Sequence, residues 1–270
     1  MRLMVWRAAV RIAYRGEDFI GSQRQPHERT VEDEVIRCLR RIKAIGGLNE
    51  ARFRVASRTD RGVSALCNVV AFDTSFRREK LLGALNSQAD GVFFTALAEV
   101  PSSWSPRRAD ERWYRYFLPI GNIDTRKAIE AAKVFEGEHD FRRFCKVDAR
   151  GTKKRLSGVE AFPLGEFLVI DLRGREFLRN MVRRIVAAVD AVGRGKATVE
   201  DIERALNGES ASFGLAPAEN LVLMLVSYSN IEFESSFPGS LRRRAEEMRR
   251  RSFVEMAFAD GLLAGCERTC

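Results

Sequence analysis

One carboxylate in this sequence has an unusual setting. Asp60 lies between Arg58 and Arg61, in the segment S-R-T-D-R-G over residues 57–62. An Asp near a Gly is typical of a tight turn, in which the carboxylate bonds its own backbone. Two flanking guanidinium groups would also keep it ionised, and an ionised carboxylate can act as a nucleophile in neutral water. The residue types alone leave both interpretations open.

Few other side chains offer chemistry. The five Cys are scattered and form no C-x-x-C pair, which indicates reduced thiols in a core. The two His, His27 and His139, lack the spacing of zinc ligands or of a Ser-His-Asp triad. No G-x-G-x-x-G or G-x-x-x-x-G-K-[ST] segment predicts a nucleotide site. We therefore expect no metal and no cofactor, and chemistry carried by carboxylates, Arg, Tyr or hydroxyls.

The charge balance favours a nucleic-acid partner. The 270 residues include 46 Lys and Arg against 37 Asp and Glu, a net charge of +9, and only eight of the cations are Lys. Arg has the planar fork that suits phosphates and stacked bases. Apolar stretches such as 221–226 are far shorter than the roughly 20 residues of a membrane span. The start of the chain has no secretory signal, so we expect a cytoplasmic protein without a membrane partner.

The elements that must position Asp60 follow a recognisable order. Strands are predicted over 5–14, 53–56, 69–72 and 92–100, and helices over 31–45, after a Thr30 cap, and over 79–87. The 57–62 segment is then a turn between two strands. This β-α-β-β-α-β order is that of a ferredoxin-like unit, and we assign it to residues 1–103.

The order recurs after a linker at 101–106. Strands are predicted over 112–120, 154–162, 167–172 and 221–228, and helices over 125–135, over 177–192 and after a Thr198 cap. We assign this second half to residues 104–235. The fold class is therefore α/β, more narrowly α+β: two ferredoxin-like halves related by a pseudo-two-fold axis share an extended mixed sheet, with a cleft between them. Residues 236–270 form a basic helical tail over 241–259, which either packs as a solvated face or contacts RNA.

Six segments follow one another along the chain: G-E-D-F-I-G-S-Q-R-Q-P at 16–26, R-T-D-R-G-V-S-A at 58–65, R-W-Y-R-Y at 112–116, G-E-H-D-F at 137–141, F-L-R-N-M-V-R-R-I at 177–185 and A-E-N-L-V-L at 218–223. In this order they resemble motifs of the TruA family of tRNA pseudouridine synthases, and the 58–65 segment resembles its G-R-T-D-x-G-V-H-A. Arg61 and the Arg-rich tail resemble the archaeal branch of the family. The chain departs from the family pattern at Ser22, Ser57, Ser64 and Asn220, and their effect on substrate choice stays open.

The resemblance implies a reaction and a set of roles. Uridine becomes pseudouridine by breaking the glycosidic bond and rejoining the base through carbon, which needs neither metal nor redox cofactor. Asp60 would be the nucleophile, attacking base or sugar. Arg183 would pair with it through both arms of its guanidinium. Tyr114 would stack on the base and take a proton from the ring carbon, after tuning of its pKa. Leu221 would form the apolar wall.

RNA-binding residues are expected around this site. A uridine in a stem must be flipped out, and Arg58, Arg107 and Arg24 are candidates for holding the RNA. Wider phosphate contacts are predicted at Arg77, Arg78, Arg108, Lys153 and Lys154. His139 and Asp140 are expected to orient a loop beside the cleft.

The resemblance also implies a homodimer that acts on the anticodon stem-loop of tRNA, at positions 38–40. Two other functions remain open from the sequence. One is a non-catalytic RNA-binding protein or RNA chaperone that uses the same basic cleft. The other is a metal-dependent nuclease built on Asp60 with Asp18 or Asp140, whose signature would be a requirement for Mg²⁺.

Overall fold

The computed structural model describes residues 4–147, 151–235 and 239–269. The first half of the chain contains β1 (Trp6–Tyr14), η1 (Gly16–Asp18), α1 (Val31–Arg41), β2 (Arg54–Val55), β3 (Ser64–Thr74), α2 (Arg78–Gln88) and β4 (Val92–Val100). The second half contains β5 (Glu111–Pro119), α3 (Thr125–Lys133), β6 (Gly137–Asp140), η2 (Phe141–Phe144), β7 (Lys153–Leu164), β8 (Phe167–Gly174), α4 (Met181–Gly193), α5 (Val199–Leu206) and β9 (Leu221–Ser227). A short strand, β10 (Glu234–Ser235), precedes the terminal helix α6 (Gly239–Thr269).

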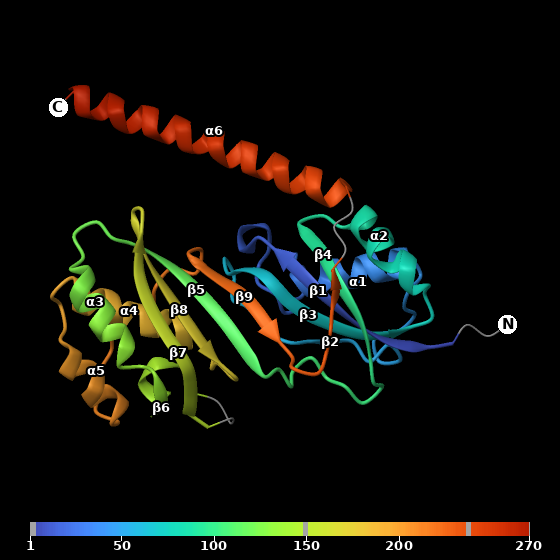
Figure 1. Cartoon of the computed structure of the whole chain (residues 1–270), viewed down its shortest axis with the longest axis horizontal. Helices are drawn as coiled ribbons and strands as arrows, with labels where there is room; N and C mark the ends of the chain where they lie inside the picture. The colour runs from blue at the N-terminus through green and yellow to red at the C-terminus, as the bar shows by residue number, and fades with distance from the viewer. Residues whose placement is uncertain (1–3, 148–150, 236–238, 270) are drawn as a thin grey trace.

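The strands of the described chain join in a single mixed sheet (Figure 1). Its order is β10-β4-β1-β3-β9-β5-β8-β7-β6, with β2 paired to β3 beside this path. The order β4-β1-β3-β2 of the first half recurs as β9-β5-β8-β7 in the second. The predicted mixed α+β class with one large sheet is therefore confirmed.

Strand β3 joins the two halves because two neighbours share one of its edges. Near its start, Ser64 and Ala65 pair in parallel with Val222 and Leu223 of β9. Farther along, Val70 and Ala71 pair with β2 instead. The chain between β2 and β3, which carries Asp60, therefore turns beside the point where β9 begins.

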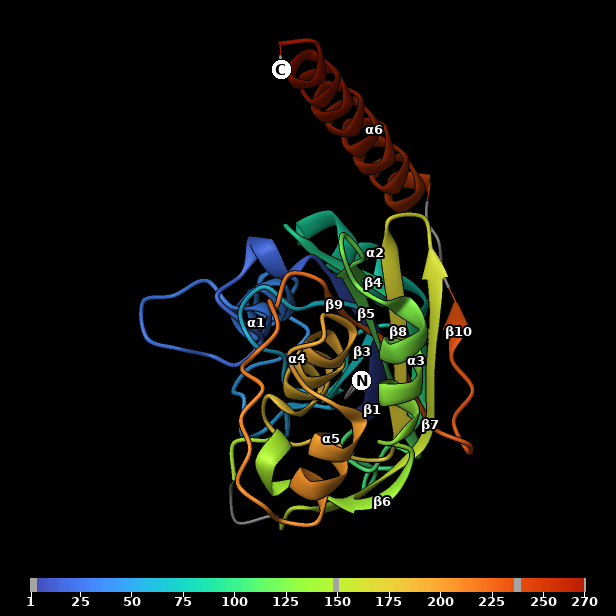
Figure 2. The ribbon, with the colours of Figure 1, turned by 90° about the vertical axis from the view of Figure 1, so that its left-hand side faces the viewer.

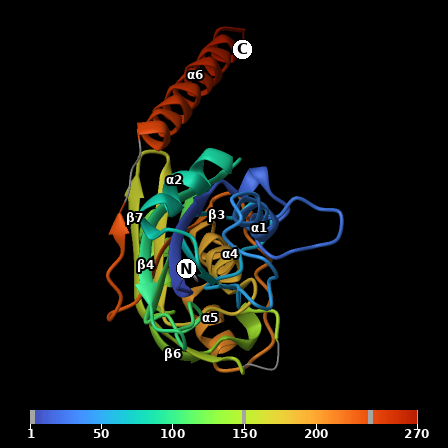
Figure 3. The same cartoon turned by 90° about the vertical axis from the view of Figure 1, so that its right-hand side faces the viewer.

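Alternation along the strands shows which face carries the core. In β5, Arg112, Tyr114, Tyr116 and Leu118 are buried, whereas the residues between them are partly exposed. Such a pattern is typical of a sheet with one covered and one more open face. Figures 2 and 3 show α1 and α4 together on one side of the sheet. The covered face of β5 thus points toward the side on which α4 lies.

Several boundaries differ from the sequence prediction. The helix expected over 177–192 begins only at Met181, because Asn180 has a φ of +64° and the Leu178 carbonyl accepts a bond from the Met181 amide at 3.1 Å. This turn frees Phe177 to pack elsewhere. The short edge strand β6 was not predicted. The two predicted helix caps, Thr30 and Thr198, each accept a hydrogen bond from the backbone three residues on.

The terminal helix α6 stands away from the rest of the chain (Figures 2 and 3). It is longer than the predicted 241–259. Leu241 is buried, but residues 249–260 are exposed throughout, and these include Phe253, Val254, Met256 and Phe258. No helix in the described ranges is both long and apolar enough to cross a bilayer.

Candidate active site

Asp60 lies on the turn between β2 and β3, where the sequence predicted a turn. The Val63 amide bonds the Asp60 carbonyl at 3.2 Å. Gly62 has a φ of +86°, which a side chain would strain, and an added Cβ would lie 3.1 Å from Glu219 Oε1. The backbone therefore bends sharply after Asp60, against the segment that leads into β9.

A second segment, residues 16–22, packs against this turn. A Cβ on Gly16 would lie 2.2 Å from the Gly62 carbonyl oxygen, so only glycine allows the two backbones to touch. The Gly16 amide donates to Ser64 Oγ at 3.0 Å. Gly21, with a φ of +88°, packs against the backbone of Thr59, Asp60 and Arg61. The segment at 16–22 thus acts as a platform for the Asp60 turn.

Thr59 is held on both its backbone and its side chain. Its amide donates to Ser22 Oγ at 2.7 Å, and its carbonyl accepts from the Ser22 amide at 3.1 Å. Its hydroxyl lies 2.8 Å from the Tyr14 hydroxyl, which accepts from Asn68 at 3.3 Å. Burial raises the pKa of Tyr14 to about 12, so this phenol stays neutral. The residue before Asp60 is therefore fixed inside the core.

Arg183 of α4 reaches Asp60 across 123 residues of sequence. Its Nη1 lies 3.4 Å from Asp60 Oδ2, with the Asp60 side chain 35% exposed and that of Arg183 16%. The sequence predicted a contact through both arms of the guanidinium, whereas the structure shows a contact through one. The reason is that Arg183 Nε donates to the Ala216 carbonyl at 2.7 Å. Arg183 thus connects the carboxylate to the segment before β9.

Tyr114 lies on the covered face of β5 near this ion pair. Its ring packs edge-on against Phe177, with the centroids 4.8 Å apart. Burial raises the pKa of Tyr114, whereas the positive charge of Arg112 and a hydrogen bond with Ser57 lower it. The negative charge of Asp60 raises it further, which places the phenol within the electrostatic field of that carboxylate.

Arg112 and Ser57 were not predicted as site residues. Arg112 is buried, its Nε donates to Ser57 Oγ at 2.9 Å, and its Nη2 donates to the Ala56 carbonyl at 3.1 Å. It also donates to the carbonyls of Arg107 and Arg175. Arg112 belongs to the R-W-Y-R-Y segment, and Ser57 is one of the departures noted above, so both could have been found from the motifs.

Leu221 begins β9 and is buried. It pairs with Tyr116 of β5, and Leu223 pairs with Tyr114. Opposite residues of an antiparallel pair share a face, so Leu221 lies diagonally beside Tyr114. Leu223 is the direct neighbour of Tyr114. It was not predicted as a site residue.

Comparison with known proteins places the chain in a family. A family model for tRNA pseudouridine synthases matches residues 131–229. The tRNA pseudouridine synthase A of Pyrococcus abyssi is 41% identical over 84% of this chain and 86% of its own length. That of Thermococcus onnurineus is 39% identical, over 96% of this chain and 99% of its own. The chain belongs to the tRNA pseudouridine synthase A family.

The family gives the reaction class and the substrate class. The chain is an isomerase, a tRNA pseudouridine synthase, and its substrate is tRNA. A third relative, from Methanosarcina barkeri, is 37% identical over 95% of this chain and 97% of its own. These relatives come from archaea, as Arg61 and the Arg-rich tail predicted. Among solved structures, one of a Cbf5-Nop10-Gar1 complex is only distantly similar, with a TM-score of 0.35 and 15% identity over 68% of this chain and 45% of that one.

A tRNA pseudouridine synthase must also bind RNA, and the predicted cations fall into two groups. Arg58, Arg107 and Arg24 are exposed, as are Arg77, Arg108 and Lys153. Burial raises the pKa of Glu32, and the charges of Arg58 and Arg24 lower it, so both cations lie near this carboxylate. The second group is engaged: Arg78 pairs with Glu234 at 2.6 Å, and Lys154 with Glu176 at 3.0 Å.

The remaining candidates lie elsewhere in this tRNA pseudouridine synthase. His139 and Asp140 belong to β6, which is separated from β5 in the sheet by β8 and β7. Asp140 bonds Arg142, which lowers its pKa to about 2, and His139 Nε2 bonds the Glu136 carbonyl at 2.9 Å. Asp18 is exposed in η1. Within the described ranges, no three His, Cys, Asp or Glu side chains gather as metal ligands.

Proposed function

We propose that Asp60 is the nucleophile of this tRNA pseudouridine synthase, with Arg183 and Tyr114 as its catalytic partners. The observation that carries the proposal is the ion pair between Asp60 and Arg183, which joins two distant segments in a partly exposed place. A carboxylate that was only a turn-former would need no such partner. A cation beside the carboxylate favours its ionised form, which is the nucleophilic one.

The reaction is an internal exchange of bonds. The bond between the ribose C1′ and the base N1 breaks, the base turns, and a new bond forms between C1′ and C5. The hydrogen on C5 leaves as a proton, and N1 gains one. Asp60 can assist by attack on the ribose or on the base, and it is regenerated in either case.

The other residues divide the remaining tasks. Tyr114 lies on the covered face near Asp60, where its ring can stack on the base and its oxygen can take the C5 proton. Leu221, with Leu223, supplies the apolar wall. Arg58, Arg107 and Arg24 are exposed, and Arg24 Nε lies 4.0 Å from Glu32 Oε2. All three can hold the flipped-out nucleotide and its neighbours. The reaction that the resemblance implies needs no metal and no redox cofactor.

The finer substrate is the anticodon stem-loop, at positions 38–40, and the enzyme works as a homodimer in the cytoplasm. The motif resemblance supports the stem-loop and the homodimer, and the tRNA substrate supports the cytoplasmic location. A set of tRNA transcripts that keep uridine at only one of the three positions tests the first. Sedimentation of the full chain, with and without tRNA, tests the second.

Tritium release tests the central proposal. A tRNA transcript labelled at C5 of uridine is incubated with the full chain in the presence of EDTA. We expect release by the wild type and none by Asp60→Ala. Since one carboxylate in a basic site contributes little to binding, the variant should bind tRNA within a few fold of the wild type.

Three outcomes contradict the proposal. Normal release by Asp60→Ala would remove Asp60 from the mechanism. Loss of release by the wild type in EDTA, with recovery in Mg²⁺, would point to metal-dependent chemistry. No tritium release by the wild type, together with tight tRNA binding, would favour a non-catalytic RNA-binding protein.

A further inference from the structure

Helix α6 carries a dense positive charge on a part of the chain that the proposed catalytic site does not use. Residues 242–251 contain six Arg and two Glu. The first turn is fixed to the body: Leu241 is 4% exposed, and the Arg244 guanidinium lies 4.6 Å from the centroid of the Phe93 ring. Beyond that turn, residues 245–260 are exposed, apart from the half-buried Met248. The body therefore holds α6 at one end and leaves its charged surface open.

Four of these arginines have no acidic partner within the described ranges. They are Arg242, Arg243, Arg249 and Arg250, and all are exposed. Arg251 pairs with Glu247 at 2.5 Å, and Arg244 donates to the Ala89 carbonyl at 3.4 Å. Unpaired exposed arginines on a structured helix are available for a multivalent anion.

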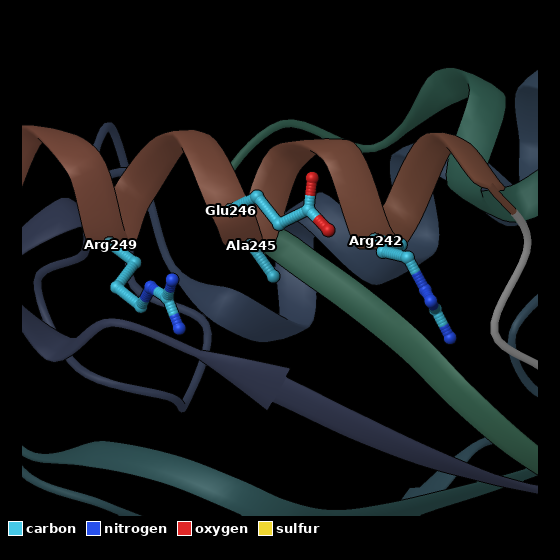
Figure 4. Close-up of a pocket in the computed structure, with 4 residues that line it drawn as sticks. All are labelled: Arg242, Ala245, Glu246 and Arg249. Carbon is cyan, nitrogen blue, oxygen red and sulfur yellow. The ribbon is translucent and has the colours of Figure 1, made fainter.

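Two of the four arginines face the body. Arg242 and Arg249 are seven residues apart, two turns of helix, and so share one face. With Ala245 and Glu246 they line an open hollow on α6. Figure 4 shows both guanidinium groups pointing from α6 toward the strands below. The charge is thus directed into the space between the helix and the sheet.

The helix also runs over the part of the molecule that holds the proposed site. In Figure 1, α6 starts beside α2 and runs above the ends of the central strands toward the side of α3. Strand β9 begins on the side that faces α6, and the Asp60 turn lies beside this start. With 31 residues, α6 has a length of roughly 45 Å, which is long enough to follow an RNA stem beyond the reacting nucleotide.

We propose that residues 242–251 of α6 bind the phosphate backbone of the substrate tRNA. The occupant follows from charge complementarity: a cationic helix, open toward the site, in an enzyme whose substrate is a polyanion. Such contacts need no base recognition, and they position the RNA. The inference requires that the chain binds tRNA, and it does not depend on the chemistry assigned to Asp60.

A charge-neutralising variant tests the proposal. The full chain with Arg242, Arg243, Arg249 and Arg250 all changed to Gln is compared with the wild type for binding of a tRNA transcript over a range of salt concentrations. Each lost phosphate contact lowers the slope of log Kd against log salt by about 0.7–0.9. For three or four contacts we expect the slope to fall by about 2–3 and the affinity at low salt to fall at least about tenfold.

The control removes the same charge at a distance. Arg126, Lys127, Lys133 and Lys196 are exposed on and near α3 and α4, and the same change to Gln there should alter affinity much less. An equal loss in both variants would show that net charge alone matters, and would overturn the proposal. Unchanged tRNA binding with an altered sedimentation coefficient would do the same, because α6 would then be a protein contact.

A single substitution provides a test of opposite sign. Glu246 lies between Arg242 and Arg249 in the hollow, where a carboxylate repels phosphate. Glu246→Gln should therefore bind tRNA more tightly, whereas Glu130→Gln on α3 should not. Weaker or unchanged binding by Glu246→Gln would contradict an RNA phosphate in this hollow. Binding is measured instead of turnover, so a failure of the Asp60 mechanism would leave the result interpretable.

Discussion

The Asp60 turn and helix α6 represent two opposite ways to build a functional region. The turn is supported from several sides: Gly16 touches its backbone, Ser22 bonds Thr59, and Arg183 reaches Asp60 from the other half of the chain. Helix α6 contacts the body through its first turn, with Leu241 buried, and residues 249–260 are exposed.

The difference reflects what each region has to do. A nucleophile must be placed within a fraction of an ångström of one atom, so its backbone is over-determined by contacts. Attraction of a polyanion acts over about 8–10 Å at ordinary salt and tolerates an inexact position. Rigid support is therefore concentrated at the turn, and charge is concentrated on the helix.

The largest expected effect is on kcat for the Asp60 turn and on tRNA affinity for α6. Asp60→Asn keeps the shape of the side chain and removes its charge, so kcat should fall by at least about 10⁴-fold while Kd for tRNA changes little. The four-Gln variant of α6 should instead show its effect in Kd and in the salt slope. Single-turnover rates and filter binding on both variants measure this. A similar rise in Kd for both variants would contradict this division of roles.

Arg183 is expected to give the next largest effect, because it is the support that comes from the second half. Removal of the guanidinium in Arg183→Ala leaves Asp60 without its cation and should lower kcat by about 10²–10³-fold. Arg183→Lys keeps a positive charge, so its kcat should fall less than that of Arg183→Ala. Its kcat should still fall, because Lys cannot both reach Asp60 and bond the Ala216 carbonyl. Rates at saturating tRNA test the order. Equal losses would show that a positive charge alone does not support Asp60 and that the guanidinium itself is required.

The sequence predicted much of this arrangement, and the reason lies in where the signals are. Hydrophobic periodicity and the Thr30 and Thr198 caps are local signals, and they located the helices. The turn at 57–62 was also predicted, since Asp and Gly mark such turns. The meeting of Asp60 with Arg183 was predicted only through the family resemblance, because nothing local connects residues 123 positions apart.

Other features could not be read from the sequence. Asn180 has a left-handed backbone conformation, so the residues before Met181 form a turn instead of the first turn of the helix. Phe177 then packs against Tyr114. The platform under Asp60 depends on Gly16 lying against Gly62, a contact set by tertiary packing. The roles of Ser22 and Ser64 as hydrogen-bond partners are likewise visible only once the two segments meet.

Gly16 offers a test of whether the platform matters. In Gly16→Ala the new methyl would overlap the Gly62 backbone, so the free energy of unfolding should fall by about 1–3 kcal/mol and kcat should fall with it. Gly83→Ala is the matched control, because an added methyl in the middle of α2 meets nothing within 4 Å. It should raise the stability by about 0.5–1 kcal/mol. Urea unfolding gives both values, and a harmless Gly16→Ala would refute close support of the turn.

The smallest effect concerns the buried contact between Arg112, Ser57 and Tyr114. A hydrogen bond from Ser57 favours the phenolate, so its loss in Ser57→Ala should raise the pKa of Tyr114 above its already raised position. At a fixed pH below that pKa, the variant has a smaller phenolate fraction than the wild type. The rate of any step in which Tyr114 takes a proton then falls in proportion. We expect a loss of no more than about tenfold near neutrality, the equivalent of one hydrogen bond.

The pH dependence distinguishes this tuning from a packing effect. In the wild type, the rate should rise with pH as Tyr114 loses its proton, and in Ser57→Ala the same rise should move to higher pH. Tyr114→Phe has no phenol, so adding Ser57→Ala to it should change the rate no further. A rate lowered equally at every pH, or an additive loss in the double variant, would show that Ser57 only fills space. Ser57 would then contribute packing to the site, without control over the protonation of Tyr114.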